Sequence, residues 1–238
     1  MKKILRYLSI ILVLSPLNVL AHGYWIELEG NHQVKQTCTI KLIFGEYHLA
    51  EKLSGNKLDR MKDIRVTVVL PNGKQQTIAM KQLPECWQGT FIPETDGIYA
   101  VLGINDEREV QDWTQHGLGI VRPIQYLKAV YEVGKTAKNN SVIGHLFDID
   151  ITKNNTGNYE LYLSKDKKPV DTCYIAIVNP AGEEEEAKTD VNGKATFTTK
   201  ADGLYLISIE WIDKTPGSFK GKEYKTIRHR IDYSLYSK

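Results

Sequence analysis

His22 carries the most distinctive chemistry in this sequence, because an export signal is predicted to end directly before it. Residues 2–6 include three basic side chains and no acidic ones, and residues 10–20 are mostly apolar. Val19 and Ala21 supply the small residues that a signal peptidase accepts. Residues 1–21 are therefore predicted to be a cleaved signal peptide. The processed chain would begin with a histidine whose α-amino group is free.

An N-terminal histidine can bind one metal ion through two nitrogens, its α-amine and its own ring. The small chelate ring holds both donors at a low entropic cost, and nitrogen donors favour Cu(II) or Ni(II). A third donor from elsewhere would complete such a site. The alternative is that cleavage leaves an exposed terminal histidine with no metal, and the sequence leaves both readings of His22 open.

Glu46 and His48 form a second candidate, because they follow the apolar strand predicted at Ile40–Phe44. Side chains at the end of a strand emerge at the edge of a sandwich, where loops carry function. Residues two apart share a face if the strand continues, so one metal ion could take both side chains. The alternative is ordinary polar chemistry at the end of a strand.

His229 is the remaining candidate ligand, and it alternates with Ile227 and Ile231. A histidine on an apolar face is more often packed and hydrogen-bonded than bound to metal, so ligation is the minority reading. His116 is an outside candidate in a loop, whereas His32 and His145 are predicted at the surface. The predicted metal ligands are therefore His22, Glu46, His48 and His229.

Sequence motifs of catalysis are missing from this chain. It contains no Gly-x-Ser-x-Gly elbow, no His-Glu-x-x-His helix and no phosphate-binding glycine loop. The chain also has no CxxC pair, the spacing that would indicate redox chemistry or a zinc knot. We therefore expect no catalytic or cofactor-binding residues.

The chain has three cysteines, so at most one disulfide can form within it. Cys38 and Cys86 are the expected pair, and Cys173 is expected to be a buried thiol.

The charge balance of the mature chain argues against electrostatic binding to nucleic acid. Without residues 1–21, the chain has 28 Lys and Arg against 29 Asp and Glu, a net charge near −1. The residue directly after Ala21 is not a cysteine, so no lipid anchor is indicated, and no later apolar run is long enough to span a bilayer. The predicted location is the periplasm or the exterior, with no transmembrane segment in the mature chain.

A repeated phrase divides the chain into two similar halves. Both copies combine a hydrophobic run that ends in a Pro-x-Gly turn, a Thr-Phe pair, and an Asp-Gly-x-Tyr segment. The first copy reads Val68 to Gly73, Gly89 to Phe91 and Asp96 to Val101, and the second reads Ala176 to Gly182, Ala195 to Phe197 and Asp202 to Ile207. The spacing from phenylalanine to Asp-Gly is the same in both.

The fold predicted from these patterns is all-β, with consecutive immunoglobulin-like or prealbumin-like antiparallel β-sandwiches. β-Branched and aromatic runs alternate with proline and glycine turns, and no long amphipathic helix is indicated. The predicted division is a sandwich at 22–133, a linker at 134–141 and a second sandwich at 142–238. The acidic run at 183–186 is predicted to be a solvated edge that discourages edge-to-edge pairing.

Several phrases of the chain, taken in order, resemble a family of exported bacterial proteins of unknown function that is allied to periplasmic components of nickel and cobalt uptake. They are His22 to Glu27, Phe44 to Tyr47, Asp96 to Tyr99, Lys168 to Val170, Thr189 to Gly193, and Lys214 to Tyr224. The second half alone resembles transthyretin-like and carboxypeptidase regulatory-like modules. The mature chains of family members often begin with His-Ala or His-Asp, whereas this one has His22-Gly23. The family's metal ligands are therefore not assigned as a set to residues of this chain.

The resemblance implies an exported binding protein that handles a transition metal ion, with nickel or cobalt favoured over copper. It also implies an inner-membrane metal transporter as a partner. Two other functions stay open on the sequence: a structural or adhesive pair of immunoglobulin-like modules without metal, and a copper enzyme that oxidises polysaccharide through a histidine brace at His22.

Overall fold

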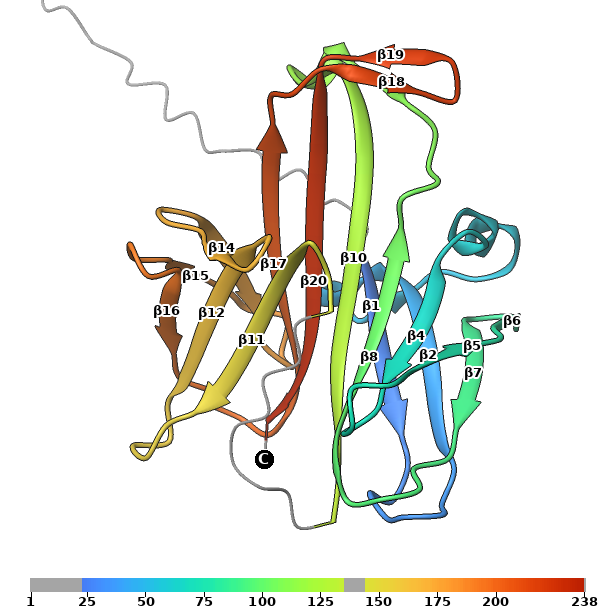
Figure 1. Cartoon of the computed structure of the whole chain (residues 1–238), viewed down its shortest axis with the longest axis vertical. Coiled ribbons are helices and arrows are strands. Elements are labelled where there is room, and N and C mark those ends of the chain that lie inside the picture. The colour runs from blue at the N-terminus through green and yellow to red at the C-terminus, as the bar shows by residue number, and fades with distance from the viewer. Residues whose placement is uncertain (1–22, 135–143, 238) are drawn as a thin grey trace, which may run out of the picture.

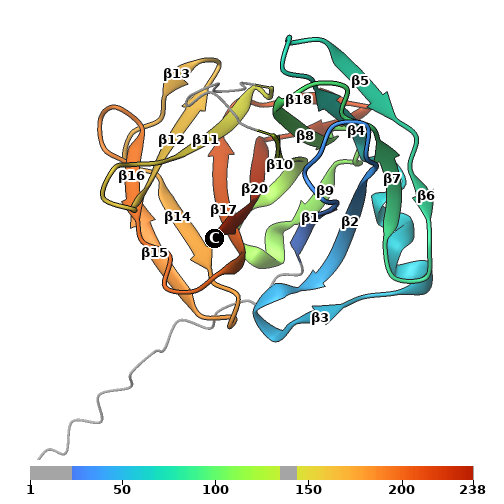
Figure 2. The ribbon, with the colours of Figure 1, turned by 90° about the horizontal axis from the view of Figure 1, so that it is seen from below.

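The protein is built from stacked β-sheets, with a long central sheet covered on opposite faces at its two ends (Figures 1 and 2). The computed structural model describes residues 23–134 and 144–237. Within these ranges the central sheet has nine strands in the order β15-β14-β17-β20-β10-β8-β4-β5, with β9 paired to the start of β10. Their bounds are β4 Arg65–Val69, β5 Gln75–Ile78, β8 Gly97–Asn105, β9 Gln111–Trp113, β10 Gly119–Val133, β14 Tyr174–Val178, β15 Glu184–Lys188, β17 Gly203–Asp213 and β20 Thr226–Ser237.

The remaining strands form smaller sheets. The first outer sheet contains β1 Gly23–Glu29, β2 Cys38–Glu46, β3 Glu51–Lys52, β6 Lys81–Gln82 and β7 Trp87–Phe91. The second outer sheet contains β11 Phe147–Lys153, β12 Tyr159–Lys165, β13 Lys168–Pro169 and β16 Lys194–Phe197. A separate hairpin pairs β18 Gly217–Phe219 with β19 Lys222–Tyr224, and short 3₁₀ turns occur at η1 Tyr47–Leu49, η2 Gly55–Met61 and η3 Thr114–His116.

The halves of the chain meet where β10 and β20 lie side by side at the centre of the sheet (Figure 1). These strands pair in parallel, from Val121 opposite Thr226 to Ala129 opposite Ser234. The prediction named antiparallel sheets throughout, so this parallel pair is a feature that the sequence patterns missed. It makes one sheet continuous across both halves.

Both faces of β10 are buried, each in a different hydrophobic core. Leu127 and Ala129 point into the first core, between the central sheet and the first outer sheet. Ile124 and Tyr126 point into the second core, between the central sheet and the second outer sheet. The arrangement of the two halves matches a two-fold rotation about an axis parallel to the strands. Such a rotation keeps the corresponding strands β10 and β20 parallel and puts the two outer sheets on opposite faces of the central sheet.

The repeated phrase forms the same tyrosine corner in each half. Tyr99 of β8 donates its hydroxyl to the Thr95 carbonyl at 2.8 Å, and Tyr205 of β17 donates to the Ala201 carbonyl at 3.1 Å. In both copies the tyrosine is also a buried member of a hydrophobic core. Each tyrosine therefore fixes the turn that leads into its strand.

The glycine of each Asp-Gly pair packs against the proline of the repeated turn. Gly97 and Gly203 have φ angles of 140° and 135°, which favour glycine. A Cβ atom would lie 2.7 Å from Pro71 at Gly97 and 2.8 Å from Pro180 at Gly203. The sequence repeat is therefore a structural repeat down to individual contacts.

A smaller cluster, the junction cluster, joins the first outer sheet to the second half of the chain. It contains buried Trp25 and Ile43 from the first outer sheet, Cys86, and Leu206 from β17. Beside it, the β1 main chain is bonded to β20, because the Ile26 N–H donates to Ser234 Oγ at 3.2 Å. These contacts hold β1 and β2 in place over the second half.

The prediction of an all-β sandwich fold is confirmed, and the strands at 40–44, 64–69 and 174–178 lie within or overlap observed strands. The acidic run forms most of β15, which is an exposed edge strand of the central sheet as expected. His22 and most of the predicted linker, residues 135–141, lie outside the described residues, so the proposed division remains a prediction. None of the helices in the described ranges is long and apolar enough to cross a bilayer.

The expected Cys38–Cys86 disulfide is wrong, because both thiols are free and buried in different clusters. Cys38 pairs with Phe91, at the far end of β7 from Cys86. Five residues of extended chain span about 17 Å, far beyond the reach of a disulfide. Burial raises the pKa of the Cys38 thiol to about 12.

Candidate functional site

Glu46 and His48 lie together at a tight loop between β2 and β3. Glu46 pairs with Glu51 across the hairpin, and η1 forms the connection. The loop closes at Ala50, which has a left-handed conformation and donates its N–H to the Tyr47 carbonyl at 2.8 Å. This loop places His48 Nε2 3.7 Å from a carboxylate oxygen of Glu46.

The Nε2 atom of His48 is buried and has no hydrogen-bond partner among the described residues. The side chain as a whole is 29% exposed, and that of Glu46 is 12% exposed. A buried polar atom without a partner costs about 1–3 kcal/mol. The loop therefore keeps a nitrogen donor next to a carboxylate without satisfying it.

The second half of the chain holds this loop from the opposite side. Tyr47 donates its hydroxyl to the Leu204 carbonyl of β17, and its ring and that of Trp25 form a T-shaped pair with centroids 5.5 Å apart. Burial raises the pKa of Tyr47 to about 12, so it is a donor at neutral pH. The backbone of His48 lies against Gly182, in the turn between β14 and β15.

The described chain starts beside Glu46. Gly23, the first described residue, pairs with Gly45, the residue before Glu46. His22 precedes Gly23 by one residue and lies outside the described ranges. The structure thus brings Glu46 and His48 together and places the chain position after His22 next to them.

Below β1, the central sheet carries a buried polar network that the sequence patterns did not reveal. Arg230 Nε donates to both oxygens of Asp232, at 3.2 and 3.1 Å. Asp232 also accepts from Gln125 Nε2 at 2.7 Å and Ser208 Oγ at 2.6 Å. The only available signal was the Arg-x-Asp alternation within an apolar strand.

Arg230 reaches from this network to the start of β1. A Cβ atom on Gly23 would lie 3.1 Å from Arg230 Nη2. Charge attraction to Asp232 raises the pKa of the guanidinium, and burial opposes that rise. The network therefore lies against the backbone at the start of β1.

His229 is not part of this assembly, because it points to the opposite face of β20. Its ring is 3% exposed and lies in the second-core region among Tyr126, Phe147 and Trp211. Its Nδ1 is 3.1 Å from the Tyr126 hydroxyl. Burial lowers the pKa of His229 to about 4. The structure therefore does not bring His229 together with Glu46 and His48.

The other histidines are dispersed. His116 ends η3 and is exposed, and His32 is exposed with Nδ1 2.8 Å from the Glu132 carbonyl. His145 is not the simple surface residue that we expected. Its Nε2 lies 3.2 Å from the Leu127 carbonyl, and burial lowers its pKa.

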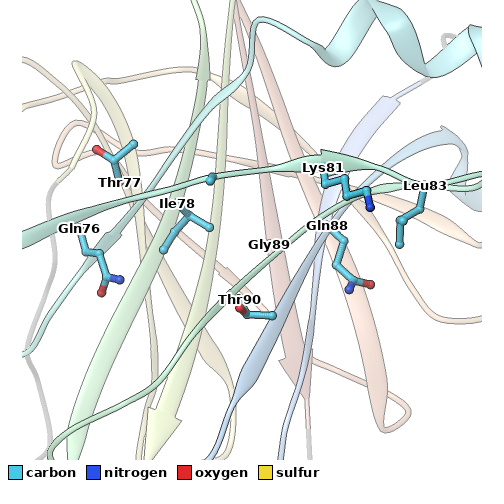
Figure 3. A pocket seen from close by; sticks show the side chains of 9 residues that line it. Gln76, Thr77, Ile78, Lys81, Leu83, Gln88, Gly89 and Thr90 are labelled. Atoms are coloured by element: carbon cyan, nitrogen blue, oxygen red, sulfur yellow. The ribbon is translucent and has the colours of Figure 1, made fainter.

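A separate open groove of about 400 Å³ lies between β5 and β7, far along the first outer sheet from β1 (Figure 3). Its lining residues are Gln76, Thr77, Ile78, Ala79, Lys81, Leu83, Gln88, Gly89 and Thr90. These side chains offer amides, hydroxyls and one ammonium, with no histidine or carboxylate among them. The groove is chemically unlike the Glu46 and His48 loop.

The described residues alone do not make up a metal site. Glu46 and His48 provide one oxygen and one nitrogen donor, types that suit first-row transition metals. Within 23–134 and 144–237, no three His, Cys, Asp or Glu side chains gather closely enough to hold a metal ion. A site at this loop with three such side chains would need one from outside these ranges.

Comparisons with solved structures give only distant similarity. A DUF4785 family protein from Legionella pneumophila is 10% identical, with 78% of this chain and 50% of that chain covered and a TM-score of 0.28. This chain therefore spans half the length of the Legionella chain. A two-domain fibronectin type III segment of chicken tenascin is 12% identical, with 90% of this chain and 100% of that chain covered and a TM-score of 0.25.

No curated protein sequence matches the chain. The profile of a domain of unknown function, DUF4198, matches residues 19–213. The match starts before Gly23, includes the Glu46 and His48 loop, and continues through β17. It therefore covers both halves of the chain and most of the central sheet. On this match the chain belongs to the DUF4198 family.

Proposed function

We propose that the protein is an exported metal-binding protein that holds one nickel or cobalt ion, with copper as a further candidate, at the end of β2. The ligands are the α-amine and ring of His22, the carboxylate of Glu46 and Nε2 of His48. The observation that carries the proposal is that His48 Nε2 is buried without a hydrogen-bond partner, 3.7 Å from a carboxylate oxygen of Glu46.

The donor set fits such an ion. Neutral imidazole and amine nitrogens with one carboxylate oxygen suit Ni(II), Co(II) and Cu(II). Metal binding would give His48 Nε2 a partner and remove the cost of its burial. The pairing of Gly23 with Gly45 supports His22 as the missing donor, because it starts the described chain next to Glu46.

The biological role proposed is accessory to nickel or cobalt uptake, by binding the ion outside the cytoplasm and passing it to an inner-membrane transporter. This role depends on removal of residues 1–21, since the α-amine of His22 is otherwise part of a peptide bond. Binding rather than catalysis is proposed, because the loop offers metal ligands but no paired nucleophile and base.

The site is tested by calorimetric titration of Ni(II) into the processed chain and into Glu46→Gln and His48→Gln variants. Each substitution should weaken binding at least about tenfold, since one donor of a few is lost. His116→Gln is the matched control, because His116 also lies in a three-residue 3₁₀ turn but is exposed. An unchanged affinity in both site variants would rule out this ligand set.

A further inference from the structure

The turn between β14 and β15 is a rigid element of the second half. Asn179 Oδ1 accepts the N–H groups of Ala181 at 2.9 Å and Glu183 at 3.0 Å, and the Gly182 N–H donates to the Asn179 carbonyl at 2.9 Å. Pro180 packs on Gly203 at the start of β17. The turn is therefore held by its own bonds and by the strand beside it.

In this turn, Gly182 lies directly against the backbone of His48. A Cβ atom on Gly182 would lie 2.1 Å from the His48 carbonyl oxygen and 3.2 Å from its Cα. Since these are backbone atoms, no side-chain rotation could make room. Gly182 has a φ of 83°, so glycine is favoured there on both grounds.

Tyr47 fixes the same loop to the neighbouring strand of the second half. Its hydroxyl donates to the Leu204 carbonyl, and Leu204 follows Gly203, against which Pro180 packs. Tyr47, next to His48 in the loop, is thus bonded to β17, the strand on which Pro180 of the β14–β15 turn also packs. The conformation of η1 depends on the second half as well as on its own hairpin.

We propose that the β14–β15 turn positions His48, so that the second half of the chain completes the metal site without contributing a ligand. This inference rests on the proposed function for its metal. Metal binding and docking of the turn on η1 are then coupled, and each must favour the other by the same factor.

The internal repeat supplies a matched control. Gly73 occupies the corresponding turn of the first half, with a φ of 79° and an N–H bond to the Leu70 carbonyl at 2.8 Å. A Cβ atom on Gly73 would meet nothing within 4 Å. Alanine at Gly73 therefore imposes the same backbone strain as alanine at Gly182 without pressing on another loop.

The test compares Ni(II) titration of the processed chain with its Gly182→Ala and Gly73→Ala variants, after circular dichroism shows that each variant is folded. Gly182→Ala should weaken Ni(II) binding at least about tenfold, a coupling of ordinary size for linked sites. Gly73→Ala should change it less than about twofold. Equal affinities in the two variants would overturn the positioning role.

Hydrogen exchange separates failure of this inference from failure of the metal proposal. Even without metal, Gly182→Ala should speed amide exchange in η1 and at Ala50, whereas Gly73→Ala should not. In the parent chain, Ni(II) should slow exchange at Gly182 and Glu183. If the parent binds no Ni(II), the metal function falls, and unchanged exchange in η1 would then remove the positioning role as well.

Discussion

Lys128 of β10 and Asp148 of β11 form an ion pair between the two halves, and each side chain is at most 3% exposed. Lys128 Nζ donates to Asp148 Oδ1 at 2.7 Å and to the Ile149 carbonyl at 2.8 Å. The other Asp148 oxygen accepts the backbone N–H groups of Gly144 and His145. The pair ties β10 to β11, on either side of the undescribed residues 135–143.

Lys128→Met should destabilise the protein by about 3–5 kcal/mol, because it leaves the Asp148 charge buried without its cation. Urea unfolding at pH 7 measures this loss. Lys220→Met is the control, since the Lys220 and Glu107 side chains are 48% and 46% exposed and their pair should contribute at most about 1 kcal/mol. Equal losses in the two variants would contradict the assigned burial.

His229 should make stability depend on pH. Its pKa in the folded chain is about 4, lowered first by burial and then by nearby Lys165 and Arg122. Between pH 6.5 and 4 the unfolded chain binds more protons at this site, so stability is complete above pH 6.5 and falls as pH falls towards 4. The loss should be about 2–3 kcal/mol.

The measurement is the free energy of unfolding at pH 7.5 and 5, in the parent chain and in His229→Gln. The variant should lose much of the difference between the two pH values. Some pH dependence of the unfolding free energy should remain in the variant, because burial also lowers the pKa of His145. A variant whose pH dependence matches that of the parent would contradict a neutral, buried His229.

At the element scale, local patterns predicted strands well and loop geometry poorly. The β-branched run at 64–69 and the apolar run at 174–178 encode β4 and β14 directly. The position of His48 was not predictable in the same way. The sequence suggested a shared strand face with Glu46, whereas η1 and the left-handed Ala50 bring them together through a turn.

The two tyrosine corners make the repeat testable. Tyr99→Phe and Tyr205→Phe each remove a hydroxyl donor while the ring stays in its core, so each should cost about 1–3 kcal/mol. Chemical denaturation compares them, with Tyr162→Phe as the control because Tyr162 is 38% exposed. A corner variant as stable as the control would show that its corner does not stabilise the fold.

At the scale of the whole molecule, the central sheet was the feature least accessible from the sequence. Val121 to Val133 is buried along most of its length on both faces, as a strand between two covering layers must be. The segment is not a continuous apolar run, because Arg122, Gln125, Lys128 and Glu132 interrupt it, and its parallel partner β20 lies about a hundred residues away. The pairing of β10 with β20 requires the second half to join the sheet with its core on the opposite face from the core of the first half. No local sequence pattern encodes that arrangement.

The shared sheet predicts that the halves depend on one another. A fragment of residues 22–134 would expose the edge of β10 that pairs with β20, together with the apolar residues facing the second core. We expect it to aggregate or to lack a cooperative unfolding transition by circular dichroism. A soluble monomeric fragment with a cooperative transition would show instead that the first half folds independently.

The central claim is that a free histidine terminus completes a metal site with Glu46 and His48, and one calorimetric comparison tests it most directly. Ni(II) is titrated into the chain that begins at His22 and into the same chain with one alanine added before His22, which converts the α-amine of His22 into an amide. The account predicts one ion bound per chain and at least about a hundredfold weaker binding in the extended chain, since one chelating donor is lost. Equal affinity in the two chains would contradict it.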